Sequence, residues 1–202
     1  MRAVVLTTAL MALCVGSSVG HSADSQDLNR LTTYICATCH GTDGNGSSSA
    51  FPRLAGQHAV YLETQLKAFK DQTRGDPSAQ AYMWGMSSLL TPDTIKQLAA
   101  YYASQKPSAG KAGDAALMTA GKAIFEQGIG EQGVPACQTC HGANAQGKDV
   151  YPRLAGQYPE YLLKQLLFFQ SLARSNAPLM HEVSDTMTFA QMQAVATYAA
   201  SK

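Results

Sequence analysis

Apolar residues recur along most of the chain with the 3.6-residue period of amphipathic helices. In the first such segment, Leu28, Leu31 and Ile35 fall on one face, and Asp24 or Ser25 is placed to cap its start. Further along, Thr91 followed by Pro92 is typical of a helix start. The pattern predicts an all-α protein, with helices over 24–38, 91–104, 114–127, 159–174 and 188–200 and one more that includes Tyr61 to Phe69 and ends by 75–78.

This pattern occurs twice. The segment 51–57 returns as 151–157 with six of seven residues identical, as Pro-Arg-Leu-Ala-Gly-Gln after an aromatic residue. After each copy the same side chains follow at helical spacing: Tyr61, Leu62, Gln65, Leu66 and Phe69, then Tyr161, Leu162, Gln165, Leu166 and Phe169. A stretch rich in glycine, serine and proline separates the copies. We therefore expect two domains, 24–106 and 115–202, joined by a linker at 107–114.

A five-residue motif occurs once in each half, as Cys36-Ala37-Thr38-Cys39-His40 and as Cys137-Gln138-Thr139-Cys140-His141. Two cysteines separated by two residues and followed by histidine are typical of c-type haem attachment. One helical turn brings both thiols to the same side, where they can form thioethers with one porphyrin. The adjacent histidine then reaches the iron. We expect two covalently bound haem c groups, attached through Cys36, Cys39, Cys137 and Cys140, with His40 and His141 as iron ligands.

Met83 and Met180 are the candidates for the second ligand of each iron. Each has seven residues between it and the threonine that opens the last helix of its half, Thr91 or Thr188. We expect both in irregular chain, where a sulfur atom can approach an iron. Methionine opposite histidine raises the reduction potential of a haem.

Three other residues compete with these methionines. Met86 follows Met83 by three residues, and His181 is adjacent to Met180, although a surface position is the simpler interpretation of this histidine. His58 has no counterpart, because tyrosine stands at 158, so we expect it to be solvated or to cap a helix. The second methionine segment therefore offers two adjacent candidate ligands, Met180 and His181.

Size and charge narrow the class of protein further. Each half has fewer than a hundred residues, and a core that small usually needs a metal, disulfides or a cofactor. A covalent haem meets that need. Seven acidic and seven basic residues lie in 24–106, and seven of each lie in 107–202, so nothing indicates a nucleic-acid surface.

The N-terminus resembles a secretory signal. Arg2 precedes an uncharged run over 3–20, and polar residues follow, so we expect a signal peptide at 1–23. A membrane anchor is the alternative, although Thr7, Thr8 and two serines interrupt a run that barely approaches the ~20 apolar residues of a span. An exported chain with haem motifs points to the bacterial periplasm.

Together these motifs resemble the cytochrome c4 family of dihaem class I cytochromes. The resemblance rests on both Cys-x-x-Cys-His motifs, the repeated Pro-Arg-Leu-Ala-Gly-Gln, Met83 before Gly85, and a helix ending in Ala-Tyr-Tyr-Ala-Ser-Gln. It covers the chain beyond the N-terminal signal. Met180 departs from the pattern, because His181 and Glu182 follow it. The family implies two tandem class I cytochrome c domains related by a pseudo-twofold axis.

The resemblance also implies roles for residues around the haems. Pro52 and Pro152 would offer their carbonyls to the Nδ1-H groups of His40 and His141. Arg53 and Arg153 would lie near haem propionates, with solvated arginines as the alternative. The glutamines and tyrosines that follow would bond propionates or the other domain: Gln65, Gln165, Tyr61 and Tyr161.

The function that these features favour is a periplasmic electron carrier rather than an enzyme, with a terminal oxidase or a quinol-oxidising complex as redox partner. Loose membrane association is compatible with it. The alternative is a dihaem subunit of a catalytic complex, such as a flavocytochrome c sulfide dehydrogenase. A third class, a haem enzyme with an open iron position, requires that one methionine is not a ligand. Zinc binding does not fit cysteine pairs about a hundred residues apart, and thiol-disulfide exchange lacks a βαβ pattern.

Overall fold

The computed structural model describes residues 27–202. The predicted signal peptide and the predicted caps at Asp24 and Ser25 lie outside this range. Within it every regular element is a helix, and strand pairing is limited to two isolated bridges, Ile129 with Val134 and Lys148 with Tyr151. The all-α prediction is confirmed for the described residues.

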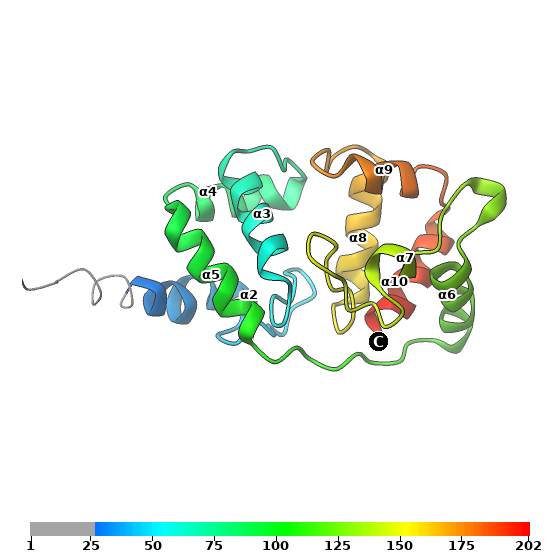
Figure 1. Ribbon diagram of the computed structural model, residues 1–202, viewed down its shortest axis with the longest axis horizontal. Helices are drawn as coiled ribbons and strands as arrows, with labels where there is room; N and C mark the ends of the chain where they lie inside the picture. Colours follow the sequence, from blue (N-terminus) through cyan, green and yellow to red (C-terminus); the bar gives the residue numbers. More distant parts are fainter. Residues whose placement is uncertain (1–26) are drawn as a thin grey trace, which may run out of the picture.

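The helices form two groups that lie side by side (Figure 1). In the N-terminal half the chain is helical from Asp27 to His40, with a π-helical turn η1 at Leu31–Ile35 and α2 at Ala37–His40. The remaining helices of this half are α3 (Ala59–Lys70), η2 (Ala79–Met83), α4 (Trp84–Ser87) and α5 (Pro92–Ser104). The C-terminal half contains α6 (Ala115–Gln127), η3 (Gly130–Gln132), α7 (Gln138–His141), α8 (Pro159–Gln170), α9 (Pro178–Ser184) and α10 (Phe189–Ala200). Between α5 and α6 the chain runs without a helix along one edge of the molecule (Figure 1).

Side chains cap the starts of three long helices, and the cap at Thr91 was predicted. The Thr91 side chain accepts a hydrogen bond from the backbone N–H of Thr94, and Pro92 occupies the first turn of α5. Asp114 caps α6 in the same way. Thr188 and Gln191 form a reciprocal capping box at α10, which satisfies two backbone donors at once. These side chains fix where the long helices begin.

Two predicted segments differ from the structure. The helix after Pro159 ends at Gln170 rather than at 174, because Leu172 adopts a positive φ of 60° and turns the chain back. The prediction of irregular chain at Met83 and Met180 is wrong, because η2 contains Met83 and α9 contains Met180. Pro77 and Pro178 each stand in the first turn of these helical segments, where proline is favoured.

Each half has its own apolar core. In the C-terminal half, α10 packs against α6 and α8, around buried residues that include Phe125, Met192 and Tyr198. In the N-terminal half, α3 packs on α5 around Leu62, Ile95 and Leu98. Among the described residues, no helix is long and apolar enough to cross a membrane.

Candidate functional site

Both cysteine motifs form one helical turn. The backbone N–H of His40 donates to Cys36 O at 2.9 Å, and that of His141 donates to Cys137 O at 3.0 Å. Immediately afterwards, Gly41 has a φ of 77°, and a Cβ there would lie 2.9 Å from the Gly46 nitrogen. Glycine therefore lets the chain leave the turn sharply after the histidine. Each motif presents two thiols and an imidazole from one short segment.

The two histidines are buried and oriented alike. His40 Nδ1 donates to Pro52 O at 2.8 Å, and His141 Nδ1 donates to Pro152 O at 2.9 Å. Burial lowers the pKa of both imidazoles, so both are neutral at pH 7. With Nδ1 as the donor, Nε2 carries the lone pair that a metal needs. The expected hydrogen bonds to Pro52 and Pro152 are confirmed.

One cavity of about 970 Å³ joins the two motifs, and both halves line it. Its wall contains all four motif cysteines, both motif histidines, Met83, Met86, Met180 and Met187. His58 and His181 are not among the lining residues, and their rings donate to Gln146 O and Phe169 O instead. The structure thus brings the predicted cysteines, histidines and methionines together and leaves the two rival histidines outside.

Met83 and Met180 occupy equivalent positions in the two halves. Ser87 Oγ donates to Met83 O at 2.7 Å, and Ser184 Oγ donates to Met180 O at 2.8 Å. Both serines are fully buried. Met86 also lines the cavity, but 58% of its surface is exposed. The matched serine contacts favour Met83 and Met180 as the related pair.

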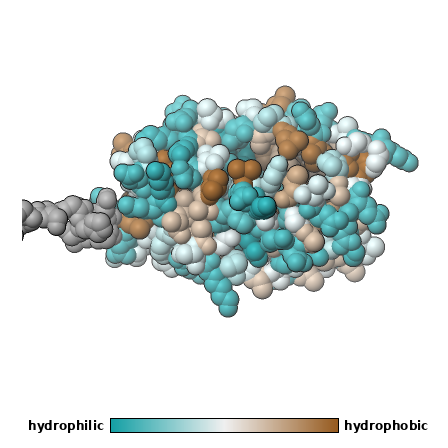
Figure 2. Space-filling model, in the orientation of Figure 1, coloured by the Kyte–Doolittle hydropathy of each residue, from teal (hydrophilic) through white to brown (hydrophobic). Residues whose placement is uncertain are grey.

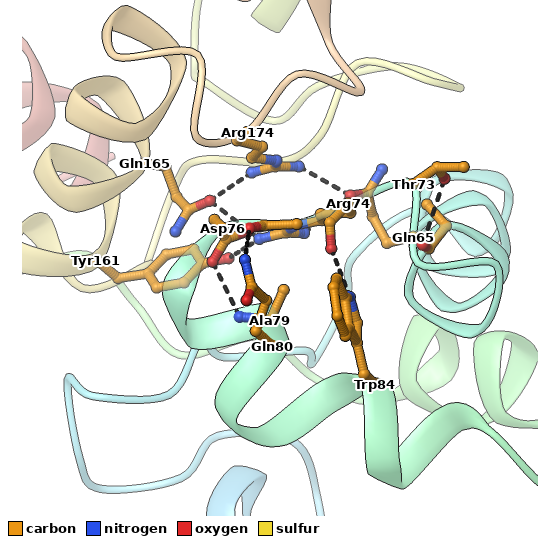
Figure 3. A network of polar contacts seen from close by, with 12 residues as sticks. Gln65, Thr73, Arg74, Asp76, Ala79, Gln80, Trp84, Tyr161, Gln165 and Arg174 are labelled. Atoms are coloured by element: carbon orange, nitrogen blue, oxygen red, sulfur yellow. Dashed lines mark hydrogen bonds and ion pairs between the residues drawn. The ribbon is translucent and has the colours of Figure 1, made fainter.

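A polar network crosses the boundary between the halves beside the cavity (Figure 3). Arg74 donates to Gln65 Oε1 in its own half at 2.8 Å and to Gln165 Oε1 in the other at 3.0 Å. Arg174 mirrors it, donating to Gln165 Oε1 at 2.6 Å and to Gln65 Oε1 at 2.9 Å. Burial raises the pKa of the Tyr61 hydroxyl, but the positive charges of Arg174 and Arg74 outweigh it and lower that pKa. The boundary therefore favours negative charge.

The two buried arginines of this network, Arg74 and Arg174, were not among the predicted site residues. They stand 100 positions apart, as the Pro-Arg-Leu elements do, and this spacing is the sequence signal for them. Arg53 and Arg153, which were predicted, donate to Gly156 O and Ala155 O respectively. Burial lowers the pKa of Arg153. All four arginines line the cavity.

The cavity fits haem. Three buried nitrogen donors in its wall have no partner within residues 27–202: Arg53 Nε, Gln165 Nε2 and Arg174 Nε. Such donors suit the carboxylates of haem propionates. Burial raises the pKa of the Cys137 thiol to about 11 and raises that of Cys36, so neither resembles the reactive thiolates of thiol-exchange proteins. Within the described residues, no three or more His, Cys, Asp or Glu side chains cluster as a metal site.

Comparison with known proteins agrees with this geometry. A family model described as Cytochrome c matches residues 25–106 and again 118–201. Cytochrome c-552 of Acidithiobacillus ferridurans is 40% identical over 204 residues, covering 99% of this chain and 87% of the relative. The solved structure of Acidithiobacillus ferrooxidans cytochrome c4 is 42% identical, with a TM-score of 0.78 over 83% of this chain and 98% of that one. The chain belongs to the cytochrome c4 family.

A further relative names a partner. The thiosulfate dehydrogenase electron acceptor of Thiomonas intermedia is 40% identical over 177 residues, covering 83% of this chain and 78% of the relative.

Membership in the family establishes two tandem class I cytochrome c domains, each carrying one covalently bound haem c. The protein is thus an electron-transfer cytochrome that exchanges electrons with redox partners, and it is not an enzyme.

Proposed function

We propose that the protein is a periplasmic dihaem electron carrier that passes electrons to a terminal oxidase. One observation carries the proposal: two matched sets of Cys-x-x-Cys-His and methionine surround a single cavity shared by both halves. Such a shared cavity allows an electron to pass between the two haems within one chain. The protein's own part is to hold the ligands, exclude water and set the two potentials.

The ligand assignment is part of this proposal. Cys36 and Cys39 attach the first haem, with His40 and Met83 on its iron. Cys137 and Cys140 attach the second, with His141 and Met180. Haem supplies reversible one-electron chemistry, and two six-coordinate irons leave no open position for a substrate. The matched serines behind Met83 and Met180 support the methionine assignment.

The proposed domains are 24–106 and 115–202, with 107–114 as the linker and 1–23 as a signal peptide that is removed on export. The two matches to the cytochrome c model support this division. The mass of the mature holoprotein checks both the cleavage and the haem count. A cell fractionation then checks the periplasmic location.

A spectroelectrochemical titration of the purified holoprotein tests the electron-carrier chemistry. We expect two haems per chain, two one-electron steps and methionine-to-iron charge-transfer absorption in the oxidised form. Carbon monoxide should not bind the reduced protein, because both irons are six-coordinate. One haem per chain, or carbon monoxide binding at neutral pH, would contradict the proposal.

A second candidate is the electron acceptor of a catalytic complex. The Thiomonas relative carries such a name, and its sequence aligns with most of this chain. The two candidates differ in the partner that reduces or oxidises the holoprotein. Rapid oxidation by membranes that contain a terminal oxidase supports the carrier. Co-purification with a catalytic subunit, and reduction by thiosulfate only in its presence, would instead establish the second candidate.

A further inference from the structure

Each axial histidine is bonded to a peptide group that also contacts the opposite half. The Pro52–Arg53 peptide accepts the His40 Nδ1-H through its carbonyl at 2.8 Å. The N–H of the same peptide donates to Gln157 Oε1, from the C-terminal half, at 2.9 Å. The sequence separation of the Arg53–Gln157 contact is 104 residues. A side chain of one half therefore ends the hydrogen-bond chain that begins at the histidine of the other.

The second half repeats the arrangement with the roles exchanged. His141 Nδ1 donates to Pro152 O at 2.9 Å. The N–H of the Pro152–Arg153 peptide donates to Gln57 Oε1, from the N-terminal half, at 2.8 Å. The two hydrogen-bond chains thus cross the domain boundary in opposite directions. Gln157 ends the one that begins at His40, and Gln57 ends the one that begins at His141.

Both glutamines are held firmly at the boundary. Gln157 Nε2 donates to Arg53 O at 2.9 Å, and Gln57 Nε2 donates to Arg153 O at 3.0 Å, so each amide makes a second contact with the opposite half. Gln157 Oε1 also accepts a hydrogen bond from the backbone N–H of the next residue, Tyr158, and Gln57 Oε1 accepts one from the backbone N–H of His58. Both side chains are buried, which strengthens hydrogen bonds relative to water.

We infer that Gln157 tunes the N-terminal haem and Gln57 tunes the C-terminal haem, each acting across the domain boundary as a positioning residue for the other half's axial histidine. This inference rests on the proposed assignment of His40 and His141 as iron ligands. Hydrogen bonds in a chain polarise one another, so an acceptor at the peptide N–H makes the proline carbonyl a better acceptor for the histidine. A stronger bond at Nδ1 raises the basicity of the imidazole and stabilises the ferric iron.

The test is a pair of reciprocal substitutions, Gln157→Met and Gln57→Met, in the full holoprotein. Methionine has a similar length but removes the amide. Gln157→Met should favour the reduced form of the N-terminal haem by about threefold, which is ~30 mV at 59 mV per tenfold, and leave the C-terminal haem unchanged. Gln57→Met should do the reverse. The readout is a redox titration followed by the hyperfine-shifted haem methyl resonances, with each haem assigned by single Met83→His and Met180→His variants.

Two further variants distinguish tuning of a haem's reduction potential from a general weakening of the contact between the halves. Gln157→Glu keeps the acceptor and adds negative charge once it is ionised, so at a pH where this buried carboxyl is ionised it should shift the N-terminal haem in the opposite direction to Gln157→Met. His58→Ala removes the contact to Gln146 O, 2.9 Å long across the same boundary, without touching an axial peptide. This control should leave the difference between the two potentials unchanged.

The outcomes distinguish this inference from the proposed function. If the wild-type protein lacks two histidine-ligated haems, the proposed function fails and this inference fails with it. If wild-type ligation is as proposed but Gln157→Met shifts the C-terminal haem, both haems equally, or neither, the inference alone is overturned. Should the methionine variants not assemble, Gln157→Glu decides: an unshifted N-terminal haem in that variant overturns the inference.

Discussion

The N-terminal half holds a buried carboxylate that the C-terminal half lacks. Asp76 is 1% exposed, and its Oδ2 accepts from Arg74 Nε at 3.0 Å while its Oδ1 accepts from the Ala79 N–H at 3.1 Å. Burial is the largest single influence on the pKa of Arg74 and lowers it, but Tyr161, Tyr61 and then Asp76 together raise that pKa above its ordinary value. One buried cation is therefore neutralised beside the first haem site.

The C-terminal half has one more residue between its arginine and its proline. Asn176 and Ala177 stand where the first half has Asp76 alone. Within residues 27–202, Arg174 Nε and Asn176 Oδ1 have no partner. The C-terminal half thus supplies no carboxylate of its own to Arg174, and buried positive charge disfavours the ferric iron, which is the more positive state. Two domains with nearly the same fold can therefore hold haems at unequal reduction potentials. We expect the N-terminal haem, which has Asp76 nearby, to have the lower potential.

The largest expected effect comes from removing the proposed methionine ligands one half at a time. Met83→Ala should abolish one methionine-to-iron charge-transfer absorption and lower the N-terminal potential by on the order of 100 mV, within the ~0.8 V that axial ligands span. Met180→Ala should do the same to the C-terminal haem. Met86→Ala is the matched control and should leave the visible spectrum intact. An unchanged spectrum in Met180→Ala would contradict the ligand assignment in that half.

The next largest effect concerns packing, where the two halves also differ. A Cβ built on Gly121 of α6 would lie 2.1 Å from the Ala194 carbonyl oxygen of α10, so Gly121→Ala should lower the free energy of unfolding of the C-terminal half by about 2 kcal/mol. In the N-terminal half, a Cβ built on Gly85 has no atom within 4 Å. Gly85→Ala should therefore raise the free energy of unfolding of the N-terminal half by ~0.5–1 kcal/mol. Amide hydrogen exchange in α10 and in α5 measures the stability of each half separately. Stability changes of the same sign and size in the two variants would contradict this prediction.

Local chemistry explains what the sequence predicted correctly. The haem motifs, the helix starts at Thr91 and Thr188 and the duplicated Pro-Arg-Leu element depend on residues close together in the chain. Their geometry therefore follows from spacing alone. The Pro52 and Pro152 carbonyls were expected only through the family resemblance, because no local rule links them to a histidine eleven or twelve residues away.

The contacts between the halves could not be predicted from the sequence. Gln57 and Gln157 were visible as repeated residues, but their partners lie about a hundred residues away and depend on how the domains pack. The same holds for Arg74 and Arg174, which read as ordinary polar residues near a helix end. The prediction for the Met83 segment was wrong for another reason: Asp76-Pro77 was interpreted as the end of a helix, whereas α3 already ends at Lys70 and Pro77 begins the next helical segment.

A smaller effect tests the charge difference directly. Asp76→Asn should raise the N-terminal potential by on the order of 1 kcal/mol in the ferric–ferrous equilibrium, or ~45 mV, and so bring the two haems closer together. The fold should tolerate the change, because Arg174 keeps equivalent bonds to both glutamines without a carboxylate. The reciprocal Asn176→Asp should lower the C-terminal potential. A redox titration of each variant measures this, and unchanged spacing of the two potentials would refute the electrostatic explanation.

The smallest effect is a pH dependence confined to the C-terminal half. Hydrogen bonds from Lys122 and then from the Tyr198 hydroxyl, the latter at 2.8 Å, lower the pKa of Glu126. A carboxylate with a lowered pKa contributes stability above its unfolded pKa and loses it as the pH falls through the folded one. Glu126→Gln should therefore unfold at slightly lower denaturant concentration than the wild type at neutral pH. The difference should vanish in acid, so a difference that persists below the folded pKa would show that the contact acts through packing rather than charge.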